Sequence, residues 1–277
     1  MPIMLVDSHC HLNFPDFKDD LEAVIARARG AGVQVMQTIC TELEEFDEVA
    51  GIADAHEGIY CSIGVHPNES GEKMRAGVED ILLRASHPKV IGVGETGLDY
   101  HYETSSREVQ QESFRIHIDA ARRSGLPLIV HTREADEDTV NILSEEMKKG
   151  AFKGLIHCFT SSKYLADKSI DIGLYISLSG IISFKNAEDI RNTVKTLPME
   201  RLLVETDAPF LAPLPYRGKR NEPAYVAHTN RKLAEIKGIT EEESARATTE
   251  NFFKLFDKAK APSLTLPLKG EGGEGET

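Results

Sequence analysis

The sequence predicts a closed (β/α)8 barrel of the α/β class, followed by an extra C-terminal helix and a disordered tail. Short apolar runs alternate eight times with longer segments of helical periodicity, as expected of parallel strands joined by helices. The 277 residues are enough for such a barrel, which needs about 250. Nearly every apolar run ends in a polar residue suited to metal or acid–base chemistry. That pattern favours a TIM barrel with one mouth over an open sheet with a single switch point.

The predicted elements follow one another along the chain. The eight predicted strands are residues 4–8, 33–39, 60–65, 90–94, 128–130, 155–156, 174–178 and 202–205. Amphipathic segments between them predict helices that include 21–29, 46–55, 108–123 and 138–148. Residues 221–236 are the predicted eighth helix, and 241–256 a further helix over one end of the barrel. Capping boxes mark two helix starts, Ser105 with Glu108 and Thr240 with Glu243.

We expect a single hydrolase barrel domain over residues 1–259 and a tail over residues 260–277. The tail contains LKGEGGEGET, which is rich in Gly and Glu and has no periodicity. Such a composition predicts disorder, because it offers little apolar surface to bury. A tail that binds a partner is the alternative.

Charge and cysteine content narrow the class of protein. Asp and Glu number 45 against 32 Lys and Arg, a net charge of -13, which argues against a protein that grips nucleic acid by bulk charge. The four cysteines form no CxxC pair, so reduced thiols are expected. The N-terminus does not resemble a secretory signal, and no apolar run reaches membrane-spanning length. We therefore expect a cytoplasmic protein with no membrane contact and no obligate protein partner.

The first predicted strand runs directly into the sequence His9-Cys10-His11. Alternate side chains of an extended chain face the same way, so both imidazoles can point into the barrel mouth while Cys10 faces outward. Neutral imidazole is the commonest nitrogen ligand of divalent metals. The pair is a candidate metal-binding motif.

Further candidate ligands recur at strand ends: Glu95, His131, His157 and Asp207. Successive spacings from His11 onward are 84, 36, 26 and 50 residues. Because one βα unit takes about 30 residues, these spacings place the ligands on strands one, four, five, six and eight. A lone strand-end histidine or glutamate is more often a hydrogen-bonded structural group. Six such residues in register predict instead a metal site at one mouth.

Four imidazoles and two carboxylates exceed the needs of one tetrahedral ion, so we expect two divalent metals with a bridging carboxylate. Mixed histidine and carboxylate ligands suit Zn²⁺ or Mn²⁺, with Mg²⁺ less favoured by imidazole. A metal-activated water would then attack the substrate.

Several strings along the chain carry a family resemblance: VDSHCHL, GVHP, GETGLDY, LPLIVHTREA, LIHCFTSS, LLVETDAPFLAP, YRGKRNEP and ENFFKLF. Together they resemble the TatD-like metal-dependent deoxyribonucleases of the amidohydrolase superfamily, over roughly residues 4–257. The resemblance implies a TIM barrel that hydrolyses phosphodiester bonds in DNA, acting as a 3′–5′ exonuclease on single-stranded or frayed ends. His9, His11, Glu95, His131, His157 and Asp207 match the family's metal-site pattern. Glutamate stands at position 95, where other branches of the superfamily often use a carboxylated lysine.

The expected roles are as follows. Glu95 bridges the metals, with His9 and His11 on one metal and His131 and His157 on the other or facing the substrate. Asp207 binds a metal and orients or deprotonates the attacking water, so Glu95 and Asp207 are the predicted catalytic residues.

Other residues are predicted to bind substrate or to support the ligands. His66 in GVHP is expected to hydrogen-bond the scissile phosphate, and Arg217, Lys219 and Arg220 to clamp phosphate from the loop after strand eight. Asp99 and Tyr100 are expected at the mouth, with packing an equal alternative for Tyr100. Glu205 is expected to partner a ligand. His117 is interpreted as a core histidine and Cys158 as a core thiol pointing away from the mouth.

Three functions follow from this site. The first is metal-dependent cleavage of phosphodiester bonds, with DNA as the substrate. The second is amide or ester hydrolysis, for instance of an aminoacyl ester on tRNA, because activated water attacks carbonyl carbon as well as phosphorus. The third is a binding module without catalysis, which the complete ligand set disfavours.

Overall fold

The computed structural model describes residues 4–71, 77–102 and 104–261. Eight parallel strands form one sheet in the order β1 to β8. The chain runs through β1 (Leu5–Cys10), β2 (Val33–Thr38), β3 (Ile59–Ile63), β4 (Val90–Asp99), β5 (Leu128–Arg133), β6 (Gly154–Ile156), β7 (Tyr175–Leu178) and β8 (Leu202–Val204). Beyond the end of β8, Asp207 and His11 donate backbone hydrogen bonds to His9 and Ala208, at 2.9 and 2.8 Å. These bonds join the end of β8 to β1, as the predicted barrel requires.

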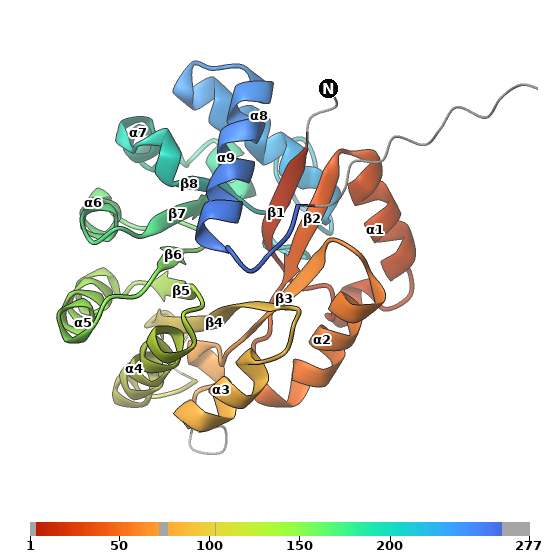
Figure 1. The fold of residues 1–277 in the computed structure, drawn as a ribbon. Helices are drawn as coiled ribbons and strands as arrows, with labels where there is room; N and C mark the ends of the chain where they lie inside the picture. The colour runs from red at the N-terminus through yellow and green to blue at the C-terminus, as the bar shows by residue number, and fades with distance from the viewer. Residues whose placement is uncertain (1–3, 72–76, 103, 262–277) are drawn as a thin grey trace, which may run out of the picture.

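Helices surround the strands on the outside of the barrel (Figure 1). They are α1 (Leu21–Gly30), α2 (Phe46–Ala55), α3 (Val78–Ala85), α4 (Arg107–Ser124), α5 (Asp136–Lys149), α6 (Lys163–Asp171), α7 (Glu188–Thr196) and α8 (Val226–Lys237). A further helix, α9 (Glu241–Leu255), follows α8. The architecture is the (β/α)8 TIM barrel that the sequence predicts. Within the described ranges, no helix is both long and apolar enough to cross a bilayer.

The extra helix α9 crosses one end of the barrel beside β1 and β8 (Figure 1). Phe252, Leu255 and Phe256 pack there against apolar side chains from inside the barrel, among them Val6 and Ile91. This packing fills the amino-terminal end of the barrel with apolar groups. The six predicted metal ligands lie at the opposite end, toward the carboxyl ends of the strands, where barrel enzymes carry their active sites.

Of the two predicted capping boxes, the structure contains one and lacks the other. Thr240 and Glu243 form the expected capping box of α9, with the Glu243 amide donating to Thr240 Oγ1 at 3.1 Å. The predicted box of Ser105 with Glu108 is wrong. Ser106 has the extended backbone of a cap and accepts a hydrogen bond from the Val109 amide at 3.4 Å, so the cap of α4 lies one residue later than predicted.

The strand that carries Glu95 is longer than predicted, since β4 extends through Asp99. Glu95 therefore lies inside the strand, and Asp99 pairs in register with Arg133 of β5.

At the C-terminal end of the chain, the predicted tail starts at residue 260. Lys260 still exchanges backbone hydrogen bonds with the Tyr60 hydroxyl, while residues 262–277 lie outside the described part of the chain.

Candidate metal centre

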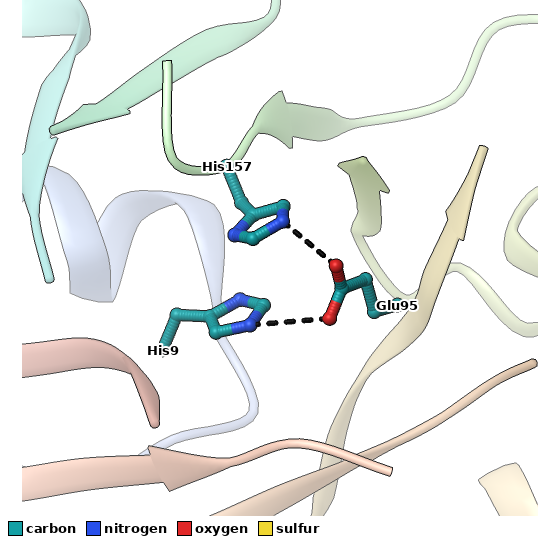
Figure 2. Close-up of side chains that lie close together, drawn as sticks. All are labelled: His9, Glu95 and His157. Carbon is teal, nitrogen blue, oxygen red and sulfur yellow. Dashed lines mark ion pairs between the residues drawn. The ribbon is translucent and has the colours of Figure 1, made fainter. Parts of the chain in front are cut away.

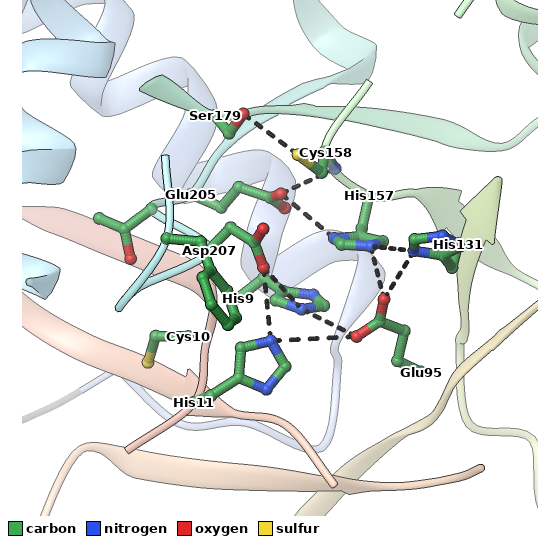
Figure 3. Close-up of polar contacts among 12 residues, drawn as sticks. His9, Cys10, His11, Glu95, His131, His157, Cys158, Ser179, Glu205 and Asp207 are labelled. Atoms are coloured by element: carbon green, nitrogen blue, oxygen red, sulfur yellow. Dashed lines mark hydrogen bonds and ion pairs between the residues drawn. The ribbon is translucent and has the colours of Figure 1, made fainter. Parts of the chain in front are cut away.

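The six predicted metal ligands converge at the carboxyl ends of the strands (Figure 3). His9 lies in β1 and His11 directly follows it; Glu95 and His131 lie in β4 and β5; His157 and Asp207 follow β6 and β8. The thiol of Cys10, between the first two histidines, points away from the cluster and donates to the Gln37 carbonyl at 3.5 Å. The alternation predicted for this strand is therefore confirmed.

One group of ligand atoms is formed by His9 Nε2, His11 Nε2, Glu95 Oε2 and Asp207 Oδ1. His9 Nε2 is 3.3 Å from the glutamate oxygen and 3.6 Å from the aspartate oxygen, and His11 Nε2 is 4.0 and 3.4 Å from them. Ligands bound at about 2.0–2.1 Å in a tetrahedral site are separated by about 3.3 Å. These four atoms are thus spaced nearly as one divalent ion would hold them.

A second group is formed by Glu95 Oε1, His131 Nδ1 and His157 Nε2. The carboxylate oxygen is 2.9 Å from the first nitrogen and 2.8 Å from the second, and the two nitrogens are 3.3 Å apart. Figure 2 shows Glu95 reaching His9 with one oxygen and His157 with the other. The two oxygens of Glu95 are therefore divided between the two groups, as in a bridging carboxylate.

The donor chemistry fits divalent metal ions. Both ring nitrogens of His9 and Nδ1 of His11 are buried with no hydrogen-bond partner among the described residues. Burial lowers the pKa of His9, which keeps a lone pair free for a metal. Burial opposes ionisation of Glu95, but the neighbouring His157 holds its pKa well below the usual range. His9 and Glu95 are then in the protonation states that metal binding requires.

Each histidine of the second group has a carboxylate on its remote nitrogen. Asp99 Oδ2 is 3.2 Å from His131 Nε2, and Glu205 Oε1 is 3.3 Å from His157 Nδ1. Glu205 also accepts from the Cys158 amide at 2.7 Å, which fixes its position. Such carboxylates orient a metal-binding imidazole and increase its basicity. Glu205 thus contacts a predicted ligand, as expected from the sequence. From the sequence, Asp99 was expected at the mouth but not as the partner of a ligand, although it shares the strand parity of Glu95.

Local backbone features place these side chains. Gly97 has φ +139°, and a Cβ atom there would lie 2.0 Å from the His131 carbonyl, so only glycine lets β4 approach β5 at this level. Asp207 has φ +57°, a conformation that aspartate tolerates better than most residues. Its neighbour Thr206 is anchored to the buried Asp7 carboxylate, at 2.8 Å from the backbone amide.

A pocket of about 790 Å³ opens above the two ligand groups. His11, Glu95, His131, His157 and Asp207 line its floor, while other lining residues include Phe14, Asn68, Asp99, Tyr102, Arg133 and Phe210. Asp99 lines the pocket as predicted. Tyr100 lies beside a neighbouring groove instead, where its hydroxyl donates to Asp138 at 2.7 Å, so packing is the better interpretation.

His66 lines the pocket beside the second group, with Nε2 3.6 Å from Glu95 Oε1. Burial, and then the proximity of His131, lower the pKa of His66 to about 3, so the ring is neutral. Its Nδ1 accepts a hydrogen bond from the Asn68 amide at 3.1 Å. The neutral ring must then carry its proton on Nε2, which faces the ligand groups.

The basic cluster of Arg217, Lys219 and Arg220 is not brought to this pocket, since none of the three is among its described lining residues. Arg220 is held by Asp20, with nitrogen–oxygen distances of 2.8 Å, and Arg217 lies 4.4 Å from the Phe184 ring. The geometry does not support the predicted phosphate clamp. Arg133, which was not predicted from the sequence, shares the strand parity of His131 and does line the pocket.

Two residues interpreted as structural have different outcomes. His117 is a core histidine, as expected: it accepts from the Val65 amide at 3.0 Å and contacts the Ser113 carbonyl at 2.7 Å. The interpretation of Cys158 as a core residue pointing away from the mouth is wrong. Its φ of +44° breaks the strand alternation after β6, and Cys158 lines the pocket with its thiol 3.2 Å from Ser179 Oγ.

Comparisons with known proteins agree with this architecture. The family model described as TatD related DNase matches residues 6–257. The uncharacterized metal-dependent hydrolase YcfH of Escherichia coli K12 is 42% identical over 92% of this chain and 96% of its own length. The uncharacterized metal-dependent hydrolase YabD of Bacillus subtilis is 41% identical over 91% of this chain and 99% of its own. The crystal structure of YjjV, a TatD homologue from E. coli, superimposes with a TM-score of 0.85 at 30% identity, covering 93% of this chain and 99% of that one.

Proposed function

Because this chain belongs to the TatD related DNase family of metal-dependent hydrolases, we propose that it hydrolyses phosphodiester bonds in DNA with two divalent metal ions. The division of the Glu95 oxygens between two ligand groups is the observation that carries the two-metal proposal. Two ions a few ångströms apart and bridged by a carboxylate are typical of enzymes that cleave phosphate esters by in-line displacement.

The residues that would hold the metals are those of the two groups. His9, His11, Asp207 and one Glu95 oxygen would bind the first ion; His131, His157 and the other Glu95 oxygen would bind the second. When bound, such ions lower the pKa of water and polarise phosphoryl oxygens. Asp99 and Glu205 would hold the two histidines of the second group in their binding orientation.

Asp207 is the proposed general base. Burial opposes its ionisation, but hydrogen bonding to His11 and the nearby His9 lower its pKa below the usual range, so it is a carboxylate at neutral pH. Its side chain remains 14% exposed and lines the pocket. An ionised carboxylate at the pocket floor can orient an attacking water and accept its proton.

His66 is the proposed hydrogen-bond donor to the scissile phosphate. Its Nε2–H faces the Glu95 side of the second ligand group, where a phosphoryl oxygen would lie. A neutral donor in a buried setting stabilises charge that develops on such an oxygen.

The pocket suits a nucleotide unit. Phe14 and Phe210 form an edge-to-face pair beside His11, and Phe210 is 51% exposed, so a nucleobase has an aromatic surface on which to stack. The volume of about 790 Å³ lies in the usual range of pockets for small ligands. The acidic chain, with net charge -13, favours engagement of a few terminal nucleotides over binding along a duplex. We therefore propose exonuclease action on single-stranded or frayed ends.

A substrate panel tests the proposal. Purified protein with Mg²⁺, Mn²⁺ or Zn²⁺ is offered labelled single-stranded DNA, a chromogenic phosphodiester and an aminoacyl ester. The expected result is release of nucleotides that a chelator abolishes and that Asp207→Asn and Glu95→Gln eliminate. Turnover of the aminoacyl ester alone would replace the proposal with ester hydrolysis, and no turnover of any substrate would refute it.

A further inference from the structure

We propose that Arg133 binds a second phosphate of the substrate, next to the one held over the metal ligands. This inference rests on the proposed function and names its substrate more closely. It means that the pocket selects nucleotides carrying a phosphate in addition to the scissile diester. Arg133 ends β5 and lies two residues, or about 7 Å of extended chain, beyond His131.

Arg133 is the one lysine or arginine among the described residues that line the pocket. Its formally charged neighbours in the lining are otherwise carboxylates, with Glu42, Glu45 and Glu69 gathered on one stretch of wall. Mutual repulsion contributes to the raised pKa of Glu42, after burial, so that wall disfavours an anion. An anionic group entering the pocket is directed to Arg133.

The guanidinium is positioned yet unengaged. It lies 4.8 Å over the ring of Tyr102, which is itself 51% exposed at the pocket. Six other arginines pair with carboxylates, those at positions 27, 115, 122, 123, 220 and 231. Within the described ranges, Arg133 makes no ion pair and no side-chain hydrogen bond. Its planar array of N–H donors is therefore available for bidentate binding of a phosphate.

Two neighbouring contacts help to keep the N–H donors of Arg133 available. The Tyr100 amide donates to the Arg133 carbonyl at 2.9 Å, which fixes the backbone at the end of β5. The adjacent carboxylate, Glu134, is occupied by His101 at 2.7 Å. Arg133 lies two residues beyond His131 along β5, so the phosphate it would bind is the neighbour of the one over the metal ligands.

The test compares Arg133→Met with Arg107→Met as the matched control. Arg107 also stacks on a tyrosine, 4.2 Å from the Tyr100 ring, but it lines only the neighbouring groove, whereas Arg133 lines both that groove and the pocket. The metal-loaded full chain is offered the dinucleotides TpT, pTpT and TpTp, and the products are separated by chromatography. Arg133→Lys keeps the positive charge but not the planar array of N–H donors, and it serves as a second variant.

We expect wild-type protein to cleave one of the phosphorylated dinucleotides with a kcat/KM about tenfold or more above that for TpT, as a charged hydrogen-bonded pair provides. Arg133→Met should abolish that preference, so that the phosphorylated dinucleotide is cleaved no better than TpT. Arg133→Lys should keep part of the preference, and Arg107→Met should keep all of it. Equal rates on the three dinucleotides, or a preference that survives in Arg133→Met, would overturn the inference.

A binding measurement separates this inference from the proposed function. Thymidine 3′,5′-bisphosphate should bind wild-type protein about tenfold tighter than thymidine monophosphate, and Arg133→Met should remove the difference. If no dinucleotide is cleaved but the bisphosphate shows this Arg133-dependent gain, the nuclease proposal fails and the anion site stands. If DNA is cleaved but the gain is absent, the anion site fails alone.

Discussion

Asp99 Oδ2 lies 3.2 Å from His131 Nε2, on the side of the imidazole opposite to the nitrogen that faces Glu95. The ring is thus held between two carboxylates from the same strand. This relationship explains why burial, which lowers the pKa of His131, is outweighed by its carboxylate partners, so that the pKa is raised. It also assigns Asp99 a positioning role toward the second ligand group.

Replacing Asp99 with asparagine should weaken metal binding. Asp99→Asn retains an oxygen acceptor for His131 but removes the charge that raises the basicity of the ring, and loss of such a partner costs about 10- to 100-fold in metal affinity or activity. The measurement is a metal titration together with kcat and KM. Asp138→Asn is the control, because Asp138 contacts Tyr100 and no metal-ligand candidate among the described residues. Equal metal affinity in wild type and Asp99→Asn would contradict the assigned role.

Replacing Glu95 with glutamine should leave the fold intact and remove the bridge. Only one oxygen remains in Glu95→Gln, so we expect bound metal to fall from two ions per chain to one. Turnover should fall by about a hundredfold or more, as for loss of a group that stabilises transition-state charge. Elemental analysis of the dialysed protein gives the metal content, and circular dichroism checks the fold. Two tightly bound ions in the variant would show that Glu95 is no bridge.

Gly97→Ala should destabilise the protein and displace His131. The added Cβ would lie 2.0 Å from the His131 carbonyl at φ +139°, and strain of this backbone kind costs about 1–3 kcal/mol before the clash is counted. Gly173→Ala is the matched control, since it has φ +88° but no atom within 4 Å of the added Cβ. Urea unfolding of both variants measures the difference. If Gly97→Ala is no less stable than Gly173→Ala, the close approach of β4 and β5 does not limit which residue position 97 can carry.

His117 should make the fold sensitive to mild acid. Burial lowers its folded-state pKa to about 4, against about 6.5 in an unfolded chain. The unfolded state therefore binds the proton more readily, and the free energy of unfolding should decrease as pH falls from about 6.5 to about 4, by about 3 kcal/mol in total. His117→Gln removes the titrating group, so its urea-unfolding curves should depend less steeply on pH in that window. Parallel pH profiles for the two proteins would exclude this contribution.

The sequence was most informative where strand order alone decides the geometry. The spacing of His11, Glu95, His131, His157 and Asp207 counts whole βα units, and a closed barrel then brings strand ends together without any knowledge of side-chain packing. The barrel and the convergence of these residues followed from that pattern.

What the sequence did not reveal depends on register and on contacts between distant segments. Asp99 reaches His131, and Arg133 reaches the pocket, because β4 continues past Glu95 and pairs with β5. Arg220 is held by Asp20, which lies 200 residues earlier. A positive φ turns Cys158 toward the mouth, and no periodicity signals it. Each of these outcomes was decided by tertiary structure rather than by local pattern.

The most direct test of the two-metal centre is anomalous diffraction from crystals grown with Mn²⁺. We predict two peaks about 3.5–4 Å apart, one among His9, His11 and Asp207 and one between His131 and His157, with Glu95 reaching both. His66, Asp99 and His131 could also gather round an ion. A single peak, or a peak enclosed by those three residues in place of the predicted pair, would contradict the account.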